Sequence, residues 1–219
     1  MVCYKFENNK EKKLEVGKII CLARTYKKHA DEMSTKITKK PLLFFKPPSS
    51  IIFNNESIIL PKISKQVHHE VELGIVISKK GKNILKNNAI DHILGYLIGL
   101  DITARDIQSN AKKMGWPWGI AKGFDTFTPI SNVILRKDIK NPNNLDISLM
   151  VNNKYMQKSN TKNMIFSVEE IIEFISDIMT LEPGDLILTG TPEGVNEIKK
   201  GDVLKANLNN KINLRVDVK

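Results

Sequence analysis

The sequence predicts an α+β fold, in which β-strands outnumber helices and do not alternate with them. Short apolar or alternating segments typical of strands recur along the whole chain, whereas only three segments have helical character. With 219 residues, 41% of them hydrophobic and 26% charged, the chain has an ordinary globular composition and can bury a full core. We therefore expect residues 18–219 to form a single domain, and residues 1–17 an N-terminal extension or an edge strand.

The predicted strands are short apolar or alternating runs bounded by Gly, Asn or Pro. The segment 70–78 (EVELGIVIS) alternates with a period of two, and the segment 94–100 is almost entirely apolar. The pair Asn152–Asn153, which follows the segment 147–151, predicts a tight turn. The other predicted strands are 18–23, 42–46, 185–188, 203–208 and 212–218.

Three helices are predicted, and all of them are short. Residues 26–33 suffice for two helical turns. Thr103 and Asp106 have the spacing of a capping box, which predicts a helix that continues to about Met114. A second capping box, Ser167-Val-Glu-Glu170, precedes the amphipathic run IIEFISDIM, and the Pro183-Gly184 pair is predicted to end that helix.

The formal net charge of +10 raises the question of nucleic-acid binding. The lysines, however, occur as scattered pairs, and aromatic residues make up only 6% of the chain. Nucleic-acid binders more often gather basic charge on one face with aromatic residues between. We therefore favour a solvated basic surface, which would also attract a small anion. Nucleic-acid binding stays as a rival hypothesis, and a gel shift without salt-sensitive binding would exclude it.

The sequence predicts neither a membrane segment nor an export signal. No apolar run approaches the length of a bilayer-spanning helix, and the first fifteen residues are polar, with acidic residues that transit peptides lack. Cys3 and Cys21 have neither the spacing of a metal site nor the pattern of a disulfide framework. We expect a reduced, cytoplasmic compartment.

Three acidic residues are candidate metal ligands. Glu70 and Glu72 are two apart on a predicted strand, so their side chains point to the same face. Asp101 directly follows the apolar strand 94–100, where an ionised carboxylate needs a partner if it is buried. The competing interpretations are the wet side of an amphipathic strand for the two glutamates and a helix cap for Asp101.

Together these carboxylates favour a hard divalent cation, because Mg²⁺ prefers oxygen ligands and keeps coordination positions open for substrate. Zinc is the competing metal, since His68 and His69 precede Glu70 and the side chain of His68 would share the face of the glutamates. On the hardness of the ligands we predict Mg²⁺ or Mn²⁺.

A second group of residues suits acid–base and anion chemistry. His29 and Glu32 are three apart on a predicted helix, so the glutamate can fix the tautomer of the histidine and raise its basicity. The alternative is a surface pair without a role. Lys46 and Lys122 each end an apolar segment, and either stabilise an anion or extend to solvent. The loop 189–192 (TGTP) offers hydroxyl and N–H donors, as ordinary turns also do.

Taken in order, these segments resemble the fumarylacetoacetate hydrolase superfamily. The resemblance extends from about Lys18 to the C-terminus. It is strongest to the short, single-domain members, which are acylpyruvases, fumarylpyruvate hydrolases, and oxaloacetate decarboxylases or tautomerases. Several separated motifs in the same order are far more specific than any one of them. The motifs are 24–33 (RTYKKHADEM), 44–47 (FFKP), 68–72 (HHEVE), 100–108 (LDITARDIQ), 116–124 (WPWGIAKGF), 164–166 (MIF) and 188–195 (LTGTPEGV).

The resemblance implies a mixed β-roll core with few short helices, a homodimer, and a bound Mg²⁺ or Mn²⁺. It matches residues 18–219 to a catalytic domain, and it places Glu70, Glu72 and Asp101 on the metal-ligand positions of the family. The remaining site residues that it implies are the catalytic His29, Glu32 and Lys122 and the substrate-contacting Arg24, Arg105, Gln108 and Thr191.

The implied activity is metal-dependent hydrolysis of a carbon–carbon bond in an acylpyruvate, a small anionic 2-oxo acid. The same site would also support decarboxylation or keto–enol tautomerisation of oxaloacetate, and the sequence does not choose among the three reactions. The chain has Ala23 and Thr25 where the family commonly has Gly and Asn, which affects the expected substrate preference more than the metal ligands. A catalytically silent relative that keeps the fold for assembly is the non-enzymatic alternative.

Overall fold

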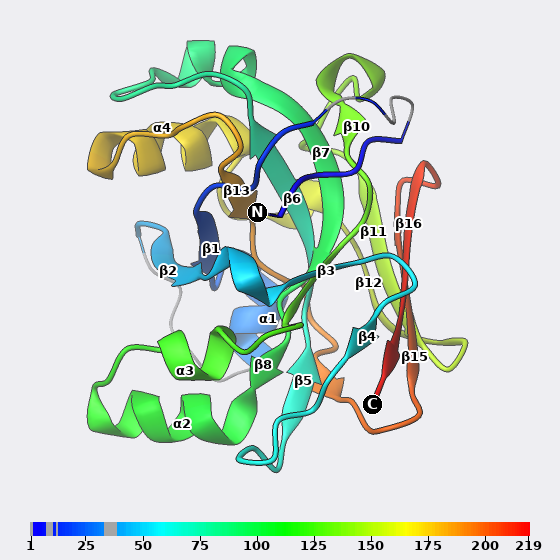
Figure 1. Ribbon diagram of the computed structural model, residues 1–219. Coiled ribbons are helices and arrows are strands. Elements are labelled where there is room, and N and C mark those ends of the chain that lie inside the picture. The colour runs from blue at the N-terminus through cyan, green and yellow to red at the C-terminus, as the bar shows by residue number, and fades with distance from the viewer. Residues whose placement is uncertain (1, 8–10, 12, 33–38) are drawn as a thin grey trace.

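The structure, a computed structural model, describes residues 2–7, 11, 13–32 and 39–219, which form three β-sheets with short helices at their edges (Figure 1). The largest sheet has eight strands in the order β2-β1-β13-β6-β7-β9-β3, with β10 paired to β7. The pairs β1–β13 and β3–β9 are parallel, whereas β6–β7 and the other pairs are antiparallel, so the sheet is mixed. Its strands are β1 (Ile19–Ala23), β2 (Leu42–Lys46), β3 (Ile51–Phe53), β6 (Val71–Ile77), β7 (Ile93–Leu100), β9 (Thr128–Ile130), β10 (Ile134–Leu135) and β13 (Leu186–Leu188).

A five-stranded sheet packs against the largest one, with β11 against β6, and β15 and β16 against β7. In sheet order its strands are β12 (Lys154–Asn160), β11 (Asp146–Val151), β15 (Val203–Leu208), β16 (Ile212–Val218) and β4 (Ser57–Ile58). The third sheet consists of β14 (Asn196–Glu197), β5 (Val67–His69) and β8 (Thr103–Ala104). This strand-rich arrangement, with a curled mixed sheet at its centre, confirms the predicted α+β fold.

The helices lie at the edges of the sheets (Figure 1). They are α1 (Lys27–Glu32), α2 (Arg105–Met114), α3 (Gly119–Lys122) and α4 (Val168–Ile178), and the 3₁₀ segments are Pro48–Ser50, Lys86–His92, Arg136–Asp138 and Thr161–Asn163. Helices α2 and α3 pack on each other and on β8, whereas α4 packs on one of the 3₁₀ segments, Lys86–His92. Among the residues that the structure describes, no helix is long and apolar enough to cross a membrane.

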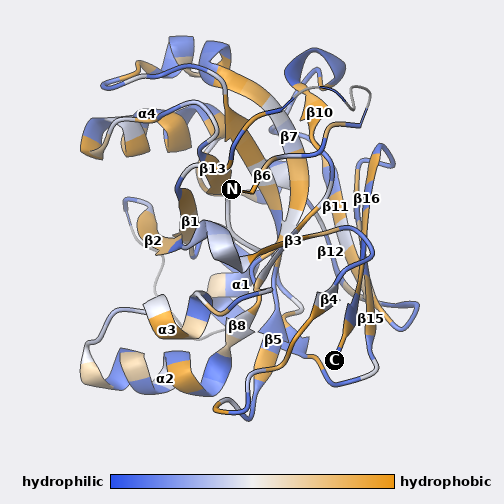
Figure 2. Cartoon of the chain, viewed as in Figure 1, coloured by the Kyte–Doolittle hydropathy of each residue, from blue (hydrophilic) through white to orange (hydrophobic). Residues whose placement is uncertain are grey.

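The central strands β6 and β7 are buried on both faces. One face belongs to the larger hydrophobic cluster, which includes residues of the five-stranded sheet and of α4. The other face belongs to a smaller cluster, which includes Tyr4, Phe6 and Val16 near the N-terminus. Hydrophobic residues accordingly concentrate on these strands in Figure 2. The interpretation of the segment 70–78 as a strand with a wet side is therefore wrong, and a carboxylate on β6 has to be held inside the protein.

Two local predictions are confirmed. The turn between β11 and β12 has Asn152 and Asn153 at φ values of 50° and 66°, the left-handed conformation that asparagine tolerates in tight hairpin turns. Helix α4 begins with the predicted capping box, because the Ser167 hydroxyl accepts from the Glu170 N–H (3.2 Å) while the Glu170 carboxylate accepts from the Ser167 N–H (2.8 Å).

Three boundaries differ from the prediction. Helix α4 ends at Ile178, five residues before Pro183, because the chain becomes extended at Met179. Helix α1 covers Lys27–Glu32 of the predicted segment 26–33, whose last residue lies outside the described part of the chain. The capping box expected at Thr103 does not form: α2 begins at Arg105 without a side-chain cap, and the Thr103 hydroxyl donates to the Asp101 carbonyl and accepts from Lys122.

The capping box of α4 leads to a prediction about stability. Replacing Ser167 with Ala leaves the Glu170 N–H without its acceptor, so we expect the free energy of unfolding to fall by about 1 kcal/mol. Urea unfolding followed by circular dichroism measures this change. Ser109→Ala on α2 is the matched control, because an exposed serine within a helix loses no cap and alanine is the better helix former. Equal midpoints for Ser167→Ala and the wild type would contradict the role of the cap.

Candidate active site

Three carboxylates meet where β6 and β7 pair. Glu72 lies on β6, Glu70 directly precedes that strand, and Asp101 directly follows β7. The antiparallel register places Val71 opposite Leu100, and the Asp101 N–H donates to the Glu70 carbonyl at 2.8 Å. One carboxylate oxygen from each of the three residues lies within 4.8 Å of the others, and the residues are 6%, 1% and 0% exposed. The structure thus brings together the three acidic residues singled out in the sequence.

Three cationic side chains surround these carboxylates. The Lys122 ammonium donates to Glu70 (2.8 Å), to Asp101 (2.5 Å) and to the Thr103 hydroxyl (2.6 Å). The Lys46 ammonium, itself buried, donates to Asp101 at 2.8 Å, and the Arg105 guanidinium pairs with Glu70. The interpretation of the two lysines as extending to solvent is therefore wrong. Both end within the protein on acidic partners.

Glu70 and Glu72 differ in how their charges are compensated. Burial raises the pKa of Glu70, but Lys122 and then Arg105 outweigh it and hold that pKa well below its usual range. The pKa of Glu72 lies well above the usual range because of burial and then the negative charges of Asp101 and Glu70. Within the described residues Glu72 has no ion-pair partner, although the Gly190 N–H donates to it at 2.7 Å. A further cation beside Glu72 would relieve this repulsion.

The donor set fits a hard divalent cation. All three groups offer carboxylate oxygen, and no histidine belongs to the cluster among the described residues. His68, the residue that would have favoured zinc, instead lies against Arg105, with 3.4 Å between His68 Nδ1 and the guanidinium Nε. Burial and then the positive charge of Arg105 lower the pKa of His68 to about 4. The buried acidic triad therefore indicates a divalent metal site.

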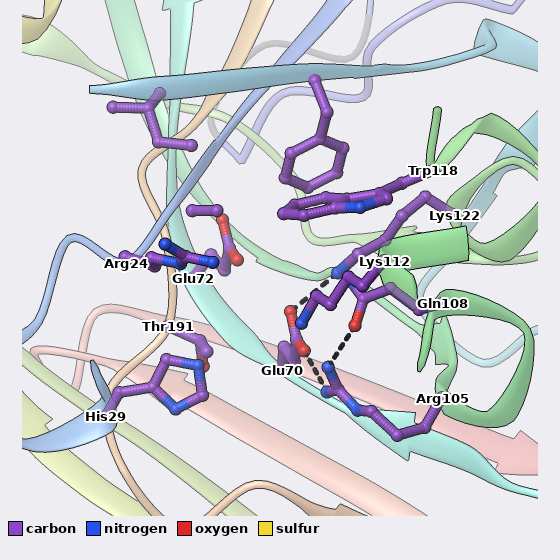
Figure 3. Close-up of a pocket in the computed structure, with 13 residues that line it drawn as sticks. Arg24, His29, Glu70, Glu72, Arg105, Gln108, Lys112, Trp118, Lys122 and Thr191 are labelled. Carbon is purple, nitrogen blue, oxygen red and sulfur yellow. Dashed lines mark hydrogen bonds and ion pairs between the residues drawn. The ribbon is translucent and has the colours of Figure 1, made fainter. Parts of the chain in front are cut away.

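The carboxylates open onto a cavity that gathers most of the predicted site residues (Figure 3). Asp101 and Glu32 are not among the lining residues, but each contacts one of them, Asp101 through Lys122 and Glu32 through His29. Besides Glu70 and Glu72, six residues singled out in the sequence line it, and they come from the end of β1, α1, α2, α3 and the loop after β13: Arg24 (directly after β1), His29, Arg105, Gln108, Lys122 and Thr191.

His29 and Glu32 form the pair expected from their spacing. The distance between His29 Nδ1 and Glu32 Oε2 is 3.3 Å, and His29 is 9% exposed. The Glu32 carboxylate also accepts from the Gly194 N–H at 3.1 and 3.2 Å, so α1 is tied to the loop after β13. Gly194 has a φ of 93°, and a Cβ there would lie 2.1 Å from the Met156 carbonyl oxygen, so the close approach requires glycine. Glu32 is therefore held both by its contact with His29 and by the loop after β13.

Ala23 and Thr25, which differ from the common family sequence, fit the structure without removing a contact of the carboxylates. Ala23 ends β1, and the residue with a left-handed backbone is Arg24, at φ 61°, so glycine freedom is not needed at position 23. The Thr25 hydroxyl, fully buried, donates to the Thr189 carbonyl at 2.7 Å. A Cβ on Gly190 would lie 2.0 Å from the Thr25 hydroxyl oxygen. Thr25 thus holds the TGTP loop close to Glu72.

Gln157 is a buried residue of the site region that sequence reasoning missed. Its amide nitrogen donates to the Thr191 hydroxyl (2.8 Å) and the Pro192 carbonyl (2.9 Å), and its oxygen accepts from the Val71 N–H (3.0 Å). It therefore joins the strand that carries Glu72 to the TGTP loop. Because the Thr191 oxygen accepts from Gln157, its own hydrogen remains available to the cavity. No signal in the strand sequence KYMQKSN distinguishes this glutamine from a surface residue.

Lys112, Phe44 and Trp118 also line the cavity and were not predicted. The Lys112 ammonium lies 5.2 Å from the centre of the Trp118 ring, and the Phe44 and Trp118 rings are 5.7 Å apart. Trp118 and Phe44 belong to motifs noted in the sequence, but nothing in those motifs indicates that the rings would face the carboxylates. Lys112 belongs to one of the scattered lysine pairs that were assigned to the solvated surface; it is exposed, as expected, and it also lines the cavity.

Known proteins are similar to this chain in sequence and in fold. A mitochondrial oxaloacetate tautomerase of Arabidopsis thaliana is 45% identical over 201 residues, which cover 92% of this chain and 90% of the relative. The mitochondrial oxaloacetate decarboxylase of Dictyostelium discoideum is 47% identical over 192 residues, or 87% and 88% of the two chains. The crystal structure of a fumarylpyruvate hydrolase from Pseudomonas aeruginosa, in complex with Mn²⁺ and pyruvate, superposes with a TM-score of 0.95 at 32% identity and covers 99% of this chain and 95% of that one.

A family model described as the fumarylacetoacetate (FAA) hydrolase C-terminal domain matches residues 18–219, nearly the whole chain. The strand-rich fold, the buried acidic triad and the relatives agree with this match. The chain belongs to the fumarylacetoacetate hydrolase family.

Proposed function

We propose that this protein is a divalent-metal-dependent enzyme that acts on small 2-oxo or 2,4-dioxo acids, with hydrolysis of a carbon–carbon bond in an acylpyruvate as its principal reaction. The observation that carries the proposal is the convergence of Glu70, Glu72 and Asp101 on one cavity edge, with Glu72 lacking a cationic partner among the described residues. A structural neighbour that is a fumarylpyruvate hydrolase with Mn²⁺ and pyruvate supports it.

The three carboxylates would hold Mg²⁺, or Mn²⁺ in its place. When bound, the cation would polarise the 2-oxo group of the substrate and stabilise the negative charge that develops as the adjacent bond breaks. Lys122 and Lys46 already offset part of the negative charge of the carboxylates, and Lys122 would also face the substrate from the cavity wall.

The substrate carboxylate would be bound by donors from α2 and the TGTP loop. Arg105 donates to the side-chain oxygen Oε1 of Gln108 at 2.7 Å, which leaves the side-chain N–H groups of Gln108 for a ligand. Thr191 contributes the hydroxyl hydrogen that Gln157 leaves available. Arg24 adds positive charge from the opposite wall of the cavity (Figure 3). These groups would orient the substrate so that its reacting carbons face His29.

His29 would act as the general base, with Glu32 as its partner. An Nδ1–H directed at Glu32 leaves Nε2 free to take a proton. For a 2,4-dioxo acid, Nε2 would take a proton from water as the water oxygen attacks the C4 carbonyl. The C3–C4 bond then breaks, C3 receives a proton, and the products are pyruvate and a carboxylic acid.

A second candidate is tautomerisation or decarboxylation of oxaloacetate, because relatives that are 45% and 47% identical bear those names. Tautomerisation needs only proton transfer between C3 and the 2-oxo oxygen, and decarboxylation replaces attack by water with loss of CO₂. The residues that bind and orient the substrate would be the same in all three reactions.

We also propose that the protein is a homodimer in the cytoplasm, with residues 18–219 as one catalytic domain. Exposed apolar side chains on β2 and α3, among them Phe45 (48%) and Ile120 (67%), offer surface for a second copy. The free thiols of Cys3 and Cys21 suit a reducing compartment, although several relatives are mitochondrial. A light-scattering mass near 24.8 kDa would exclude the dimer, and cell fractionation would test the compartment.

The direct test of the proposed function is an assay of the purified protein with Mg²⁺ or Mn²⁺. We expect pyruvate release from acylpyruvates, measured by coupling to lactate dehydrogenase, and loss of that release in EDTA. Enol-oxaloacetate, followed by its ultraviolet absorbance, and CO₂ release test the second candidate in parallel. If the metal-loaded protein turns over neither substrate, the catalytically silent alternative is supported instead.

Glu72→Gln separates metal binding from folding. The amide oxygen can still accept from the Gly190 N–H, and an uncompensated buried charge disappears, so we expect the metal-free variant to unfold at an equal or higher temperature than the wild type. Loss of a ligand should weaken Mn²⁺ binding by about tenfold or more, measured by calorimetry. Asp125→Asn, an exposed aspartate, is the control. Unchanged Mn²⁺ affinity in Glu72→Gln would remove Glu72 from the metal site.

His29→Ala tests the general base. We expect kcat for acylpyruvate hydrolysis to fall by about 100-fold or more, the usual contribution of a general base, with Mn²⁺ affinity within about twofold of the wild type. His92→Ala, at a histidine outside the cavity, should leave both quantities unchanged. An equal loss of turnover and of metal affinity would mean that His29 holds the structure rather than moves a proton.

A further inference from the structure

One face of α2 lines the cavity with three residues in succession. Arg105, Gln108 and Lys112 are three and then four residues apart, so their side chains project from the same side of the helix. Arg105 pairs with Glu70 at the start of the helix, and Gln108 accepts from Arg105. Lys112 is seven residues beyond Arg105, which separates their Cα atoms by about 10 Å along the helix. Lys112 therefore extends the row of ligand-binding side chains away from the end at Arg105.

The Lys112 ammonium lies over an aromatic ring but has no ion-pair partner among the described residues. It lies 5.2 Å from the centre of the Trp118 ring, a contact that positions a cation but carries no opposite full charge. Across the described ranges, no carboxylate lies within ion-pair distance of it. Figure 3 shows the Lys112 side chain extending into the cavity beside Lys122. The other two cations near Glu70 differ in this respect, because Lys122 and Arg105 are already paired with carboxylates.

The Trp118 ring, over which Lys112 lies, is itself packed against a neighbouring side chain. Trp118 packs against Phe44 with ring centres 5.7 Å apart, and the Lys122 ammonium lies 4.9 Å from the centre of the Phe44 ring. Lys112 and Lys122 thus lie over two aromatic side chains that contact each other in a tilted arrangement. Although Lys112 is exposed to solvent, partial burial of its ammonium and then the positive charge of Arg105 lower its pKa, a cost that an anion bound beside it would offset.

We propose that Lys112 binds the second carboxylate of a dianionic 2-oxo acid, so that the site selects 2-oxo dicarboxylates over 2-oxo monocarboxylates. The inference rests on the proposed function, since it names the substrate class of the same cavity. In this arrangement the carboxylate next to the 2-oxo group lies with Arg105, Gln108 and Thr191, and the distal carboxylate lies with Lys112. Both oxaloacetate and acylpyruvates whose acyl group carries a carboxylate belong to this class, whereas acetylpyruvate does not.

A matched pair of unreactive ligands tests the proposal by binding. Both 2-oxoglutarate and 2-oxopentanoate have five carbons and a 2-oxo acid group, and they differ in the distal carboxylate. Their affinities for the Mn²⁺-loaded protein are measured by calorimetry, with the wild type expected to prefer 2-oxoglutarate. Lys112→Met keeps an apolar stem over Trp118 and should weaken 2-oxoglutarate binding by about tenfold to a hundredfold, the range for one charge-assisted hydrogen bond. Binding of 2-oxopentanoate should change by less than about twofold.

Two further variants show whether the effect on 2-oxoglutarate binding is specific to the charge of Lys112. Lys113→Met removes the same charge from the adjacent exposed lysine, so it measures the effect of the general positive field and should leave the preference unchanged. Lys112→Arg keeps the charge and should retain the preference. Equal weakening of both ligands in Lys112→Met, no weakening of either, or the same loss in Lys113→Met would overturn the proposal. Because binding is the readout, absence of turnover would count against the proposed function and not against the role of Lys112.

Discussion

The constraint on which the rest of the site depends is the enclosure of three like charges at one strand pair. The β6–β7 register fixes the backbone of Glu70 against Asp101, and both faces of β6 are buried, so the carboxylates can neither separate nor reach solvent. Buried charges of one sign destabilise the folded state unless cations or donors compensate them. Lys46, Arg105 and Lys122 compensate two of the three carboxylates, and the raised pKa of Glu72 marks the remaining imbalance. Binding of a metal ion to such a site therefore adds to the stability of the fold.

The same ion pairs position three elements around the carboxylates. Lys46 ends β2, Lys122 ends α3 and Arg105 begins α2, and each of these elements contributes one cation. The loop after β13 is drawn in by its contact with Glu72, and Gln157 attaches the five-stranded sheet to that loop. Helices α2 and α3 have small apolar faces, so their placement owes much to these polar contacts. The residues that we propose to bind the substrate are therefore positioned by the same interactions that hold the three carboxylates.

Predictions from the sequence succeeded where a local pattern determines the structure. Asparagine at left-handed φ and the reciprocal bonds of Ser167 act within a few residues, so they can be recognised from spacing alone. The capping box predicted at Thr103 does not form, because Lys122, nineteen residues away in the sequence, donates to the hydroxyl that would have accepted the capping hydrogen bond. Gln157 and Lys112 could not be found for the same reason: their partners lie on other elements, and each sits in a segment that reads as ordinary surface. The acidic triad was recognisable because the two motifs that carry it, 68–72 and 100–108, occur in a fixed order with the other motifs, and its burial followed only from the packing of β6.

Relatives with this fold bear the names of a hydrolase, a decarboxylase and a tautomerase, so the chemistry must diverge somewhere other than in the acidic triad. All three reactions begin with a bound 2-oxo acid. They differ in the step at the part of the substrate beyond the 2-oxo group, which is attack by water, loss of CO₂ or transfer of a proton. We expect Lys112 and Trp118 on one side of the cavity and His29 on the other to face that end. A charged lysine over an aromatic ring would favour a substrate with a second carboxylate, whereas the position of His29 would decide whether water or carbon gives up the proton. On this proposal the side chains around the triad would determine specificity, while the triad would hold the cation that each of the three reactions needs.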